Sequence, residues 1–219
     1  MATRLLLADL AEQVGRDHGL DVAFESGGGV EIARRVREGA EADVLVLAHD
    51  ALRSLEDDGH VVAGTVRPLF VSDVVAAVPA SAPLPALAVE SDLSEALLAA
   101  TKVAYSTGPS GTALLDLVKQ WYLEDEVGPK LVQAPPGVPV GTFLAEGHAD
   151  LAFQQRSELT GVPGVAIVGP LPGTAAIRST FSGGVLTSSA QPELAERVLE
   201  LLRSDDAASV IRERGMEPA

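Results

Sequence analysis

Short apolar runs alternate with amphipathic stretches along the chain, and this alternation most constrains the fold. Residues 43–48 form a near-continuous apolar run of the kind that is buried on both faces of a parallel sheet. Residues 69–78 and 179–186 predict two longer strands, and helical patterns lie between the runs. A chain that alternates strands and helices in this way is expected to build an α/β fold.

The start of the chain predicts a helix. Apolar residues recur at spacings of three and four over residues 2–18, which is the pattern of an amphipathic helix, and Gly19 is a natural stop. Residues 21–26 then predict a short strand that leads into three glycines, and a second helix is expected over residues 30–38. An alternative makes Arg4–Ala8 a strand, but it leaves only a short helix with no turn residue to start it.

The two long strands bracket a self-contained block of strands and helices. The block contains a predicted strand at residues 102–106, a long helix from about Ser110 to Glu126 and a strand at residues 150–155. Bracketing of this kind predicts two lobes joined by two crossings. The expected boundaries are residues 1–75 and 179–219 for lobe 1 and residues 76–178 for lobe 2, with a ligand cleft between the lobes.

Composition excludes several classes of protein. The 219 residues include 31 Asp and Glu against 16 Lys and Arg, and a net charge of −15 repels nucleic acid and anionic membrane surfaces. The absence of cysteine excludes disulfides, thiolate metal sites and cysteine nucleophiles. No pair or trio of His, Asp and Glu shows metal-ligand spacing, so no metal site is expected. No cofactor is predicted either. The apolar stretch after Met1 is too short for a signal peptide or a membrane span, which predicts a cytoplasmic protein for the chain as written.

Six segments carry a resemblance to a known superfamily: residues 105–112, 136–142, 149–159, 162–165, 168–172 and 215–218. Through them the sequence resembles the type II periplasmic-binding-protein superfamily, in the branch of molybdate-binding-protein-like substrate-binding proteins. The resemblance implies two lobes, each a mostly parallel sheet flanked by helices. In relatives, a strand and a ligand-binding loop come before the first helix. The predicted first helix therefore implies that the first strand of lobe 1 is missing.

The resemblance implies a function as well as a fold. It implies a substrate-binding protein of an ABC transporter that holds a small anion, either a carboxylate or a molybdate-like oxyanion, with the transporter permease as its partner. The location becomes extracytoplasmic if a signal peptide and a first strand lie upstream of Met1. The branch is also similar to aconitate isomerase, so a cofactor-free isomerase of an unsaturated polycarboxylate is the alternative. A family member that has lost both activities is a third possibility.

Three loops that enter helices are the candidate ligand-binding segments, because the first N–H groups and the dipole of a helix can meet an anion. A flexible turn, a well-capped helix or a rigid Pro/Gly connection would give the same sequences without a ligand. Gln154, at the end of a predicted strand, is the remaining candidate, and Gln155 should face the other way. The loop residues predicted to contact the ligand are Ser26, Gly27 and Gly28 in the first loop, Ser106, Gly108, Ser110 and Gly111 in the second, and Val138, Pro139 and Val140 in the third.

Acid–base chemistry has no unambiguous candidate in the sequence. An isomerase needs a base close to the carbon that loses its proton. His49, Tyr105 and Glu25 are each arguable, and His49 is better explained as a contact at the end of a strand. The catalytic residues, if any, are therefore left open.

Overall fold

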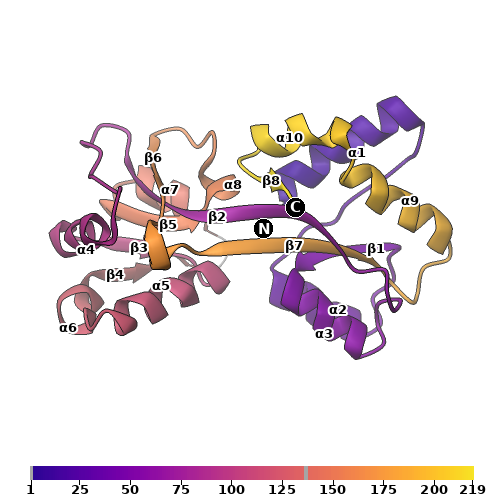
Figure 1. Ribbon diagram of the computed structural model, residues 1–219, viewed down its shortest axis with the longest axis horizontal. Helices are drawn as coiled ribbons and strands as arrows, with labels where there is room; N and C mark the ends of the chain where they lie inside the picture. The colour runs from indigo at the N-terminus through magenta and orange to yellow at the C-terminus, as the bar shows by residue number, and fades with distance from the viewer. Residues whose placement is uncertain (1, 136–137) are drawn as a thin grey trace. The chain divides into compact units, whose positions relative to one another are not determined.

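The computed structural model describes residues 2–135 and 138–219. The chain forms two compact units (Figure 1). Unit 1 consists of the chain up to Ser72 together with Ser179–Ala219, and unit 2 consists of Asp73–Arg178. Strand β2 (Arg67–Pro79) begins in unit 1 and ends in unit 2.

Helices and strands alternate in both units. The other elements of unit 1 are α1 (Arg4–His18), α2 (Gly29–Arg37), β1 (Val44–Ala48), α3 (His49–Asp57), β7 (Arg178–Val185), α9 (Pro192–Leu202), η3 (Asp205–Ala207), α10 (Ala208–Glu213) and β8 (Glu217–Pro218). Those of unit 2 are α4 (Glu90–Ala99), β3 (Val103–Tyr105), α5 (Pro109–Gln120), α6 (Glu124–Val127), η1 (Gly128–Lys130), β4 (Leu131–Gln133), α7 (Val140–Ala145), β5 (Leu151–Gln155), α8 (Arg156–Leu159), β6 (Val165–Pro170) and η2 (Gly173–Ala175). The predicted α/β class is confirmed.

The predicted first helix is confirmed as α1. Leu6, Leu7, Leu10 and Val14 are its buried residues, at the spacing that the sequence pattern requires. Gly19 ends the helix in a left-handed conformation, with φ 67°, and its N–H donates to the carbonyl of Gly15. The alternative that made residues 4–8 a strand is wrong.

The strand predicted for residues 21–26 is wrong, although its pattern is real. Val22 and Phe24 are half-buried against the core of unit 1, and the residues on either side of them are exposed. Side chains therefore alternate as in a strand. A strand also needs a neighbouring backbone for its hydrogen bonds, and the described residues supply no ladder partner to this segment.

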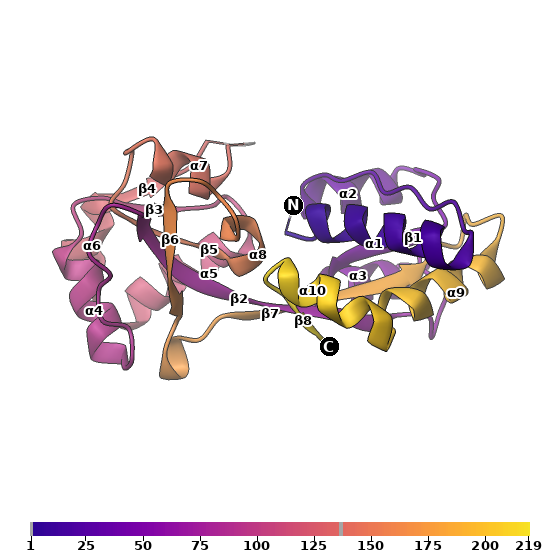
Figure 2. The ribbon, with the colours of Figure 1, turned by 90° about the horizontal axis from the view of Figure 1, so that it is seen from above.

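Unit 1 places its strands between two groups of helices. Strand β1 pairs antiparallel with β7, with Val44 opposite Val185, and β2 pairs antiparallel with β8. Val44 and Val46 face the core formed with α1, α9 and α10, and Leu45 and Leu47 face the core formed with α2 and α3. Figure 1 shows the strands of unit 1 between these two groups of helices, and Figure 2 shows the same unit from above. The expectation of a mostly parallel sheet is wrong for the described strands of unit 1. Strand β7 brings the chain back from unit 2 into unit 1, and it pairs with β1 in the opposite direction.

Unit 2 contains the parallel part of the fold. Strand β3 pairs parallel with both β4 and β5, whereas β2 lies antiparallel between β5 and β6. Alternate residues of β2 face opposite cores, Val74 and Ala76 toward α4 and α5, Val75 and Ala77 toward α7 and α8. This sheet is therefore mixed, with helices on both faces.

The long helix predicted from Ser110 to Glu126 is wrong in its length. Helix α5 ends at Gln120, and α6 is a separate element of four residues. Tyr122 separates the two, because its backbone is left-handed, with φ 55°, and cannot continue a right-handed helix. The half-buried Trp121 packs against the core next to this break.

Asp150 ties the start of β5 to the start of β3. Its carboxylate accepts the N–H groups of Thr101, at 2.8 and 3.1 Å, and of Lys102, at 2.8 Å. Burial acts to raise the pKa of Asp150, but the hydrogen bonds from Lys102 and Thr101 outweigh it and hold this pKa below its usual value. The ionised form is therefore the stabilising form.

We expect Asp150→Asn to lower the free energy of unfolding by about 1 kcal/mol at neutral pH, after allowance for solvent screening. A lowered pKa gives stability that is present above the unfolded-state pKa and is lost as the pH falls through the folded-state pKa. The difference between wild type and variant should thus shrink on acidification, as measured by urea unfolding at several pH values. Asp125→Asn, at an exposed position in α6, is the control, and a difference independent of pH would contradict this role for the carboxylate.

Within the described part of the chain, every helix is too short or too polar to cross a lipid bilayer.

Candidate functional site

The predicted site residues of unit 2 gather where two parallel strands end. Ser106 follows the last residue of β3, and Gln154 is the next-to-last residue of β5. Tyr105 and Phe153 are opposite each other in the parallel ladder, so Ser106 and Gln154 lie at the same edge of the sheet. In α/β proteins this is the edge at which ligands bind.

Helix α5 begins at this edge. Gly108 is its N-cap residue, with extended backbone, and Pro109 occupies the first helical position, where no N–H is lost. The N–H groups of Gly111 and Thr112 donate to the carbonyl of Gly108, at 3.0 and 3.2 Å, so the N–H of Ser110 is the group of this turn that can donate to an anion. Ser110 lies in this turn and is only 6% exposed.

Side chains at this helix start form one continuous hydrogen-bonded chain. The N–H of Gly108 donates to Oγ of Ser106 at 3.3 Å, and Oγ of Ser106 lies 3.0 Å from Oγ of Ser110. Ser110 Oγ donates to Oε1 of Gln154 at 2.9 Å, and Nε2 of Gln154 donates to Oε2 of Glu158 at 3.1 Å. This hydrogen-bonded series contains hydroxyls, an amide and one carboxylate, and no cationic side chain.

Glu158 is the member of this chain that sequence reasoning missed. It lies in α8, four residues after Gln154 of β5, and its side chain is half-buried. Burial raises the pKa of Glu158, whereas the positive charge of the amino terminus of the chain and the hydrogen bond from Gln154 act in the opposite direction with less effect. The spacing of four residues between Gln154 and Glu158 was the available signal. It brings the two side chains together only because a helical turn follows β5 directly.

Gly111 allows α5 to start so close to β3. A Cβ at this position would overlap the carbonyl oxygen of Ser106 and lie 2.9 Å from Cδ2 of Tyr105. Tyr105 itself is half-buried against the core of unit 2. The glycine is thus required for close packing of the helix start against the strand end.

The third predicted loop leads into α7, which packs against β3 and β5. Pro139 is the N-cap residue of α7, and the exposed Val138 donates its N–H to the carbonyl of Pro135 at 3.0 Å. The side chain of Val140 is buried in the core, so only its backbone could contact a ligand. Helix α7 has only six residues, which makes it a weak dipole. Gly137 of this loop lies outside the described residues.

The remaining predicted contacts are in unit 1, in the loop before α2. Ser26 and Gly28 are exposed, Gly27 is half-buried, and Gly28 is the N-cap residue of α2. Arg35 of α2 pairs with Glu25, with Nη1 and Oε1 2.6 Å apart, which braces the loop against the helix. The structure thus divides the predicted residues between two units, and a shared cleft stays a prediction.

The three arguable bases have other roles in the structure. The pKa of Glu25 is lowered by its hydrogen bond and its ion pair with Arg35, so Glu25 is a poor proton acceptor at neutral pH. Tyr105 packs against the core. His49 is the first residue of α3, and its Nδ1 lies 2.9 Å from Oγ of Ser182, a fully buried residue of β7. His49 therefore makes the strand-end contact that the sequence favoured.

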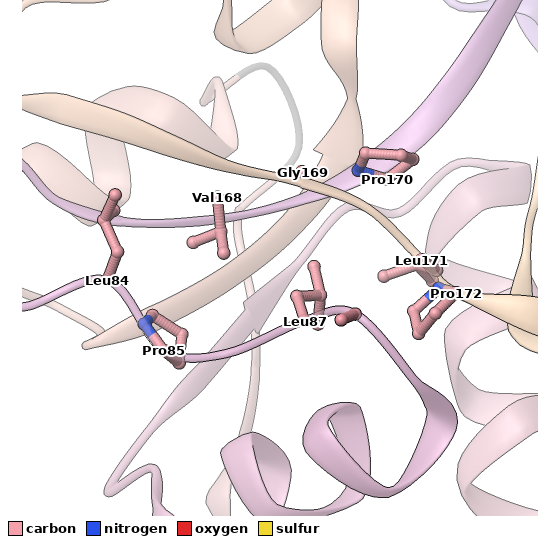
Figure 3. Close-up of a pocket in the computed structure, with 9 residues that line it drawn as sticks. Leu84, Pro85, Leu87, Val168, Gly169, Pro170, Leu171 and Pro172 are labelled. Carbon is pink, nitrogen blue, oxygen red and sulfur yellow. The ribbon is translucent and has the colours of Figure 1, made fainter.

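A cavity of about 450 Å³ in unit 2 lies apart from the predicted residues (Figure 3). The segment before α4 and the end of β6 with its following turn face each other across it. Its side chains come from Leu, Val, Pro and Ala residues, so it has no side-chain group that could orient a polar ligand. The lining residues are Leu84, Pro85, Leu87, Ala88, Val168, Gly169, Pro170, Leu171 and Pro172.

Known proteins resemble this chain over most of its length. The family described as bacterial extracellular solute-binding protein matches residues 1–217. An aconitate isomerase from Pseudomonas sp is 34% identical over 187 residues, which cover 85% of this chain and 71% of that protein.

Two solved structures show the same fold at low sequence identity. The periplasmic molybdate-binding protein of Azotobacter vinelandii has a TM-score of 0.82 at 19% identity, over 98% of this chain and 95% of its own. The substrate-binding protein of an ABC transporter from Agrobacterium tumefaciens has a TM-score of 0.75 at 17% identity, over 95% and 74%. The two-lobe periplasmic-binding-protein fold expected from the sequence is confirmed. With the family match over nearly every residue, this chain belongs to the bacterial extracellular solute-binding protein family.

Proposed function

We propose that this protein binds a small carboxylate or oxyanion through neutral donors, with the N-terminus of α5 as a principal contact. The observation that carries the proposal is the arrangement of Gly108, Ser106 and Gln154 around Ser110, whose N–H at the start of that helix is available to an anion. Backbone N–H groups, hydroxyls and amides can hold an anion without a cationic side chain. The family supports a small solute as the ligand.

A di- or tricarboxylate is the ligand class that we favour. The relative at 34% identity is named for its action on aconitate, a tricarboxylate, whereas the molybdate-binding protein shares only 19% of its residues and supports the fold alone. The loop from Ser26 to Gly28 before α2, a helix of nine residues, is the contact that we propose for unit 1. A ligand with several carboxylates can use more than one such helix start.

The transport role is the leading form of this function. Solved proteins with this fold include the substrate-binding protein of an ABC transporter, and the partner that we propose is accordingly an ABC-transporter permease. The family description places its members outside the cell, and an extracytoplasmic location is part of the proposal. Secretion of the protein from its native host, detected in the extracytoplasmic fraction, tests that location.

Ligand screening by thermal shift tests the proposal. A ligand that binds only the folded state stabilises it by about 2.7 kcal/mol at a concentration of 100 Kd. We expect trans-aconitate, cis-aconitate or citrate to raise the Tm more than molybdate, sulfate or phosphate at equal ionic strength. Stabilisation by nucleotides or sugars, with none by any of these anions, would overturn the proposal.

Ser110→Ala should weaken binding of the stabilising anion about tenfold, or about 1.4 kcal/mol. The substitution removes the hydroxyl that joins Ser106 to Gln154 and so loosens the turn that presents the N–H of residue 110. Titration calorimetry measures the change. Ser81→Ala, at an exposed position of the same unit, is the matched control, and His49→Asn should also leave the affinity unchanged. Equal affinities for Ser110→Ala and wild type would contradict a site at α5.

A cofactor-free isomerase is the second candidate, because the aconitate isomerase is 34% identical. Moving the double bond of aconitate removes a proton from one carbon and returns one to another, so a base must take the first proton and an acid must supply the second. NMR of cis-aconitate with the purified protein, without added metal or cofactor, tests this candidate. Appearance of trans-aconitate would make catalysis the function. Binding without conversion would exclude the enzyme for this substrate.

A further inference from the structure

The hydrogen-bonded chain from Glu158 to Ser106 has a direction, and ionised Glu158 sets it. An ionised carboxylate can only accept, so Gln154 must turn its NH₂ group toward Glu158 and its carbonyl oxygen toward Ser110. The single O–H of Ser110 is then used on Gln154. In its contact with Ser106, Ser110 can therefore only accept, so the single O–H of Ser106 donates to Ser110. Neither serine has a proton left for a bound anion.

A neutral Glu158 permits the opposite direction. The side-chain amide of Gln154 turns over, so that the O–H of Glu158 donates to its Oε1 and its Nε2 donates to Ser110. Ser110 donates in turn to Ser106, and the O–H of Ser106 is free to donate to an anion at the start of α5. The reversal costs one long hydrogen bond, because the N–H of Gln155 donates to Oε1 of Gln154 at 3.3 Å in the ionised form. The heavy atoms of Ser106 and Ser110 need not move.

From this geometry we propose that Glu158 is a positioning residue that links anion binding to proton uptake, by reversing the hydrogen-bonded chain through Gln154 and Ser110 so that Ser106 donates to the anion. The inference rests on the proposed anion site at α5. A bound anion and an ionised Glu158 would also repel each other, and protonation removes this repulsion.

The surroundings of Glu158 favour such a role. Helix α8 packs against α7, β5 and β6, and none of these three elements carries a titratable or charged side chain. Arg156, on α8 itself, is exposed, and Glu146 and His148, which follow α7, pair with each other at 3.3 Å. Burial raises the pKa of Glu158 above its usual value, and the positive charge of the amino terminus opposes this effect without cancelling it.

The sign of the pH dependence follows from linkage. Anion binding raises the pKa of Glu158 further, because the anion prefers the neutral form. Affinity is therefore full below the pKa of the free protein and falls as the pH rises toward the higher pKa of the complex. In that interval the affinity drops by up to about tenfold for each pH unit.

Titration calorimetry with trans-aconitate between roughly pH 6 and pH 9 tests the inference, since ordinary carboxylates are ionised throughout that range. We expect wild-type affinity to fall by up to about tenfold for each pH unit above the pKa of Glu158 in the free protein, with proton uptake in buffers of different ionisation enthalpy. Glu158→Gln should bind with nearly constant affinity and no proton uptake, because its amide can donate to Gln154 at every pH. Glu146→Gln, at an exposed position, should behave as wild type.

The outcomes separate the inference from the proposed function. Absence of trans-aconitate binding at every pH counts against the proposed function. Binding with the same pH dependence in wild type and Glu158→Gln overturns only the inference. Glu158→Ala, which also lacks the carboxyl, is a second variant if Glu158→Gln folds poorly, and it too should lose the pH dependence.

An NMR titration of the free protein tests the reversal of the hydrogen bonds directly. The side-chain carboxyl carbon of Glu158 and the side-chain amide protons of Gln154 should titrate with one common midpoint in NMR spectra of the free protein. Titration of Glu158 without any change at Gln154 would show that the chain does not reverse.

Discussion

Gly111→Ala is expected to lower the free energy of unfolding by about 3 kcal/mol and to weaken anion binding about tenfold. The new Cβ would overlap the carbonyl oxygen of Ser106, which is backbone and cannot rotate away. Helix α5 must move off β3, so Leu114 and Val118 lose packing in the core of unit 2. Thermal unfolding should show a Tm lower by roughly 6–12 °C for a chain of this size.

The control for Gly111→Ala is Asp116→Ala, at an exposed position of the same helix. Alanine favours helix, so stability should change by no more than about 0.5 kcal/mol and binding should not change. A Gly111→Ala protein that is as stable as wild type would show that the start of α5 lies farther from β3 than described. Lost stability with unchanged affinity would instead remove α5 from the binding site.

Gly183→Ala should destabilise the protein by about 2–3 kcal/mol through the core of unit 1. A Cβ at position 183 of β7 would overlap Cδ2 of Leu199 on α9 and lie 2.8 Å from Cδ1 of Leu69 on β2. Both leucines are nearly fully buried, at 2% and 1% exposure, so neither can turn aside without leaving a void. Urea unfolding should show a lower midpoint with an unchanged slope.

Gly15→Ala in α1 is the matched control for Gly183→Ala. Gly15 is exposed in the interior of a helix, and the nearest atom to a new Cβ is the carbonyl oxygen of Leu20 at 3.6 Å, an ordinary contact. Alanine should therefore stabilise the protein by about 0.5–1 kcal/mol. If both variants destabilise to the same extent, close packing at Gly183 is not the cause.

The sequence pattern located most elements because burial periodicity is a local property. Leu6, Leu7, Leu10 and Val14 predicted one helical face, and that face is buried in α1. The errors arose where a distant segment decides. Val22 and Phe24 alternate as in a strand, but strand formation depends on a neighbouring backbone.

The candidate site shows the same division. A glycine and serine turn between a strand and a helix pointed to Ser106, Gly108, Ser110 and Gly111, because the turn chemistry is encoded in consecutive residues. Their partners are not consecutive. The hydrogen bond from Ser110 to Gln154 spans 44 positions of the chain, and it brings Glu158 into the same chain of contacts.

By itself the sequence determined which residues are apolar at helical or strand spacing, where glycines allow turns, and that neutral groups outnumber basic ones near the predicted loops. Only the tertiary structure decided which strands pair, that α5 ends before Tyr122, and that Glu158 is linked to Ser110 through Gln154. The physical reason is range. Burial patterns and turns depend on neighbours within a few residues, whereas strand pairing and side-chain networks depend on segments that meet only when the chain has folded.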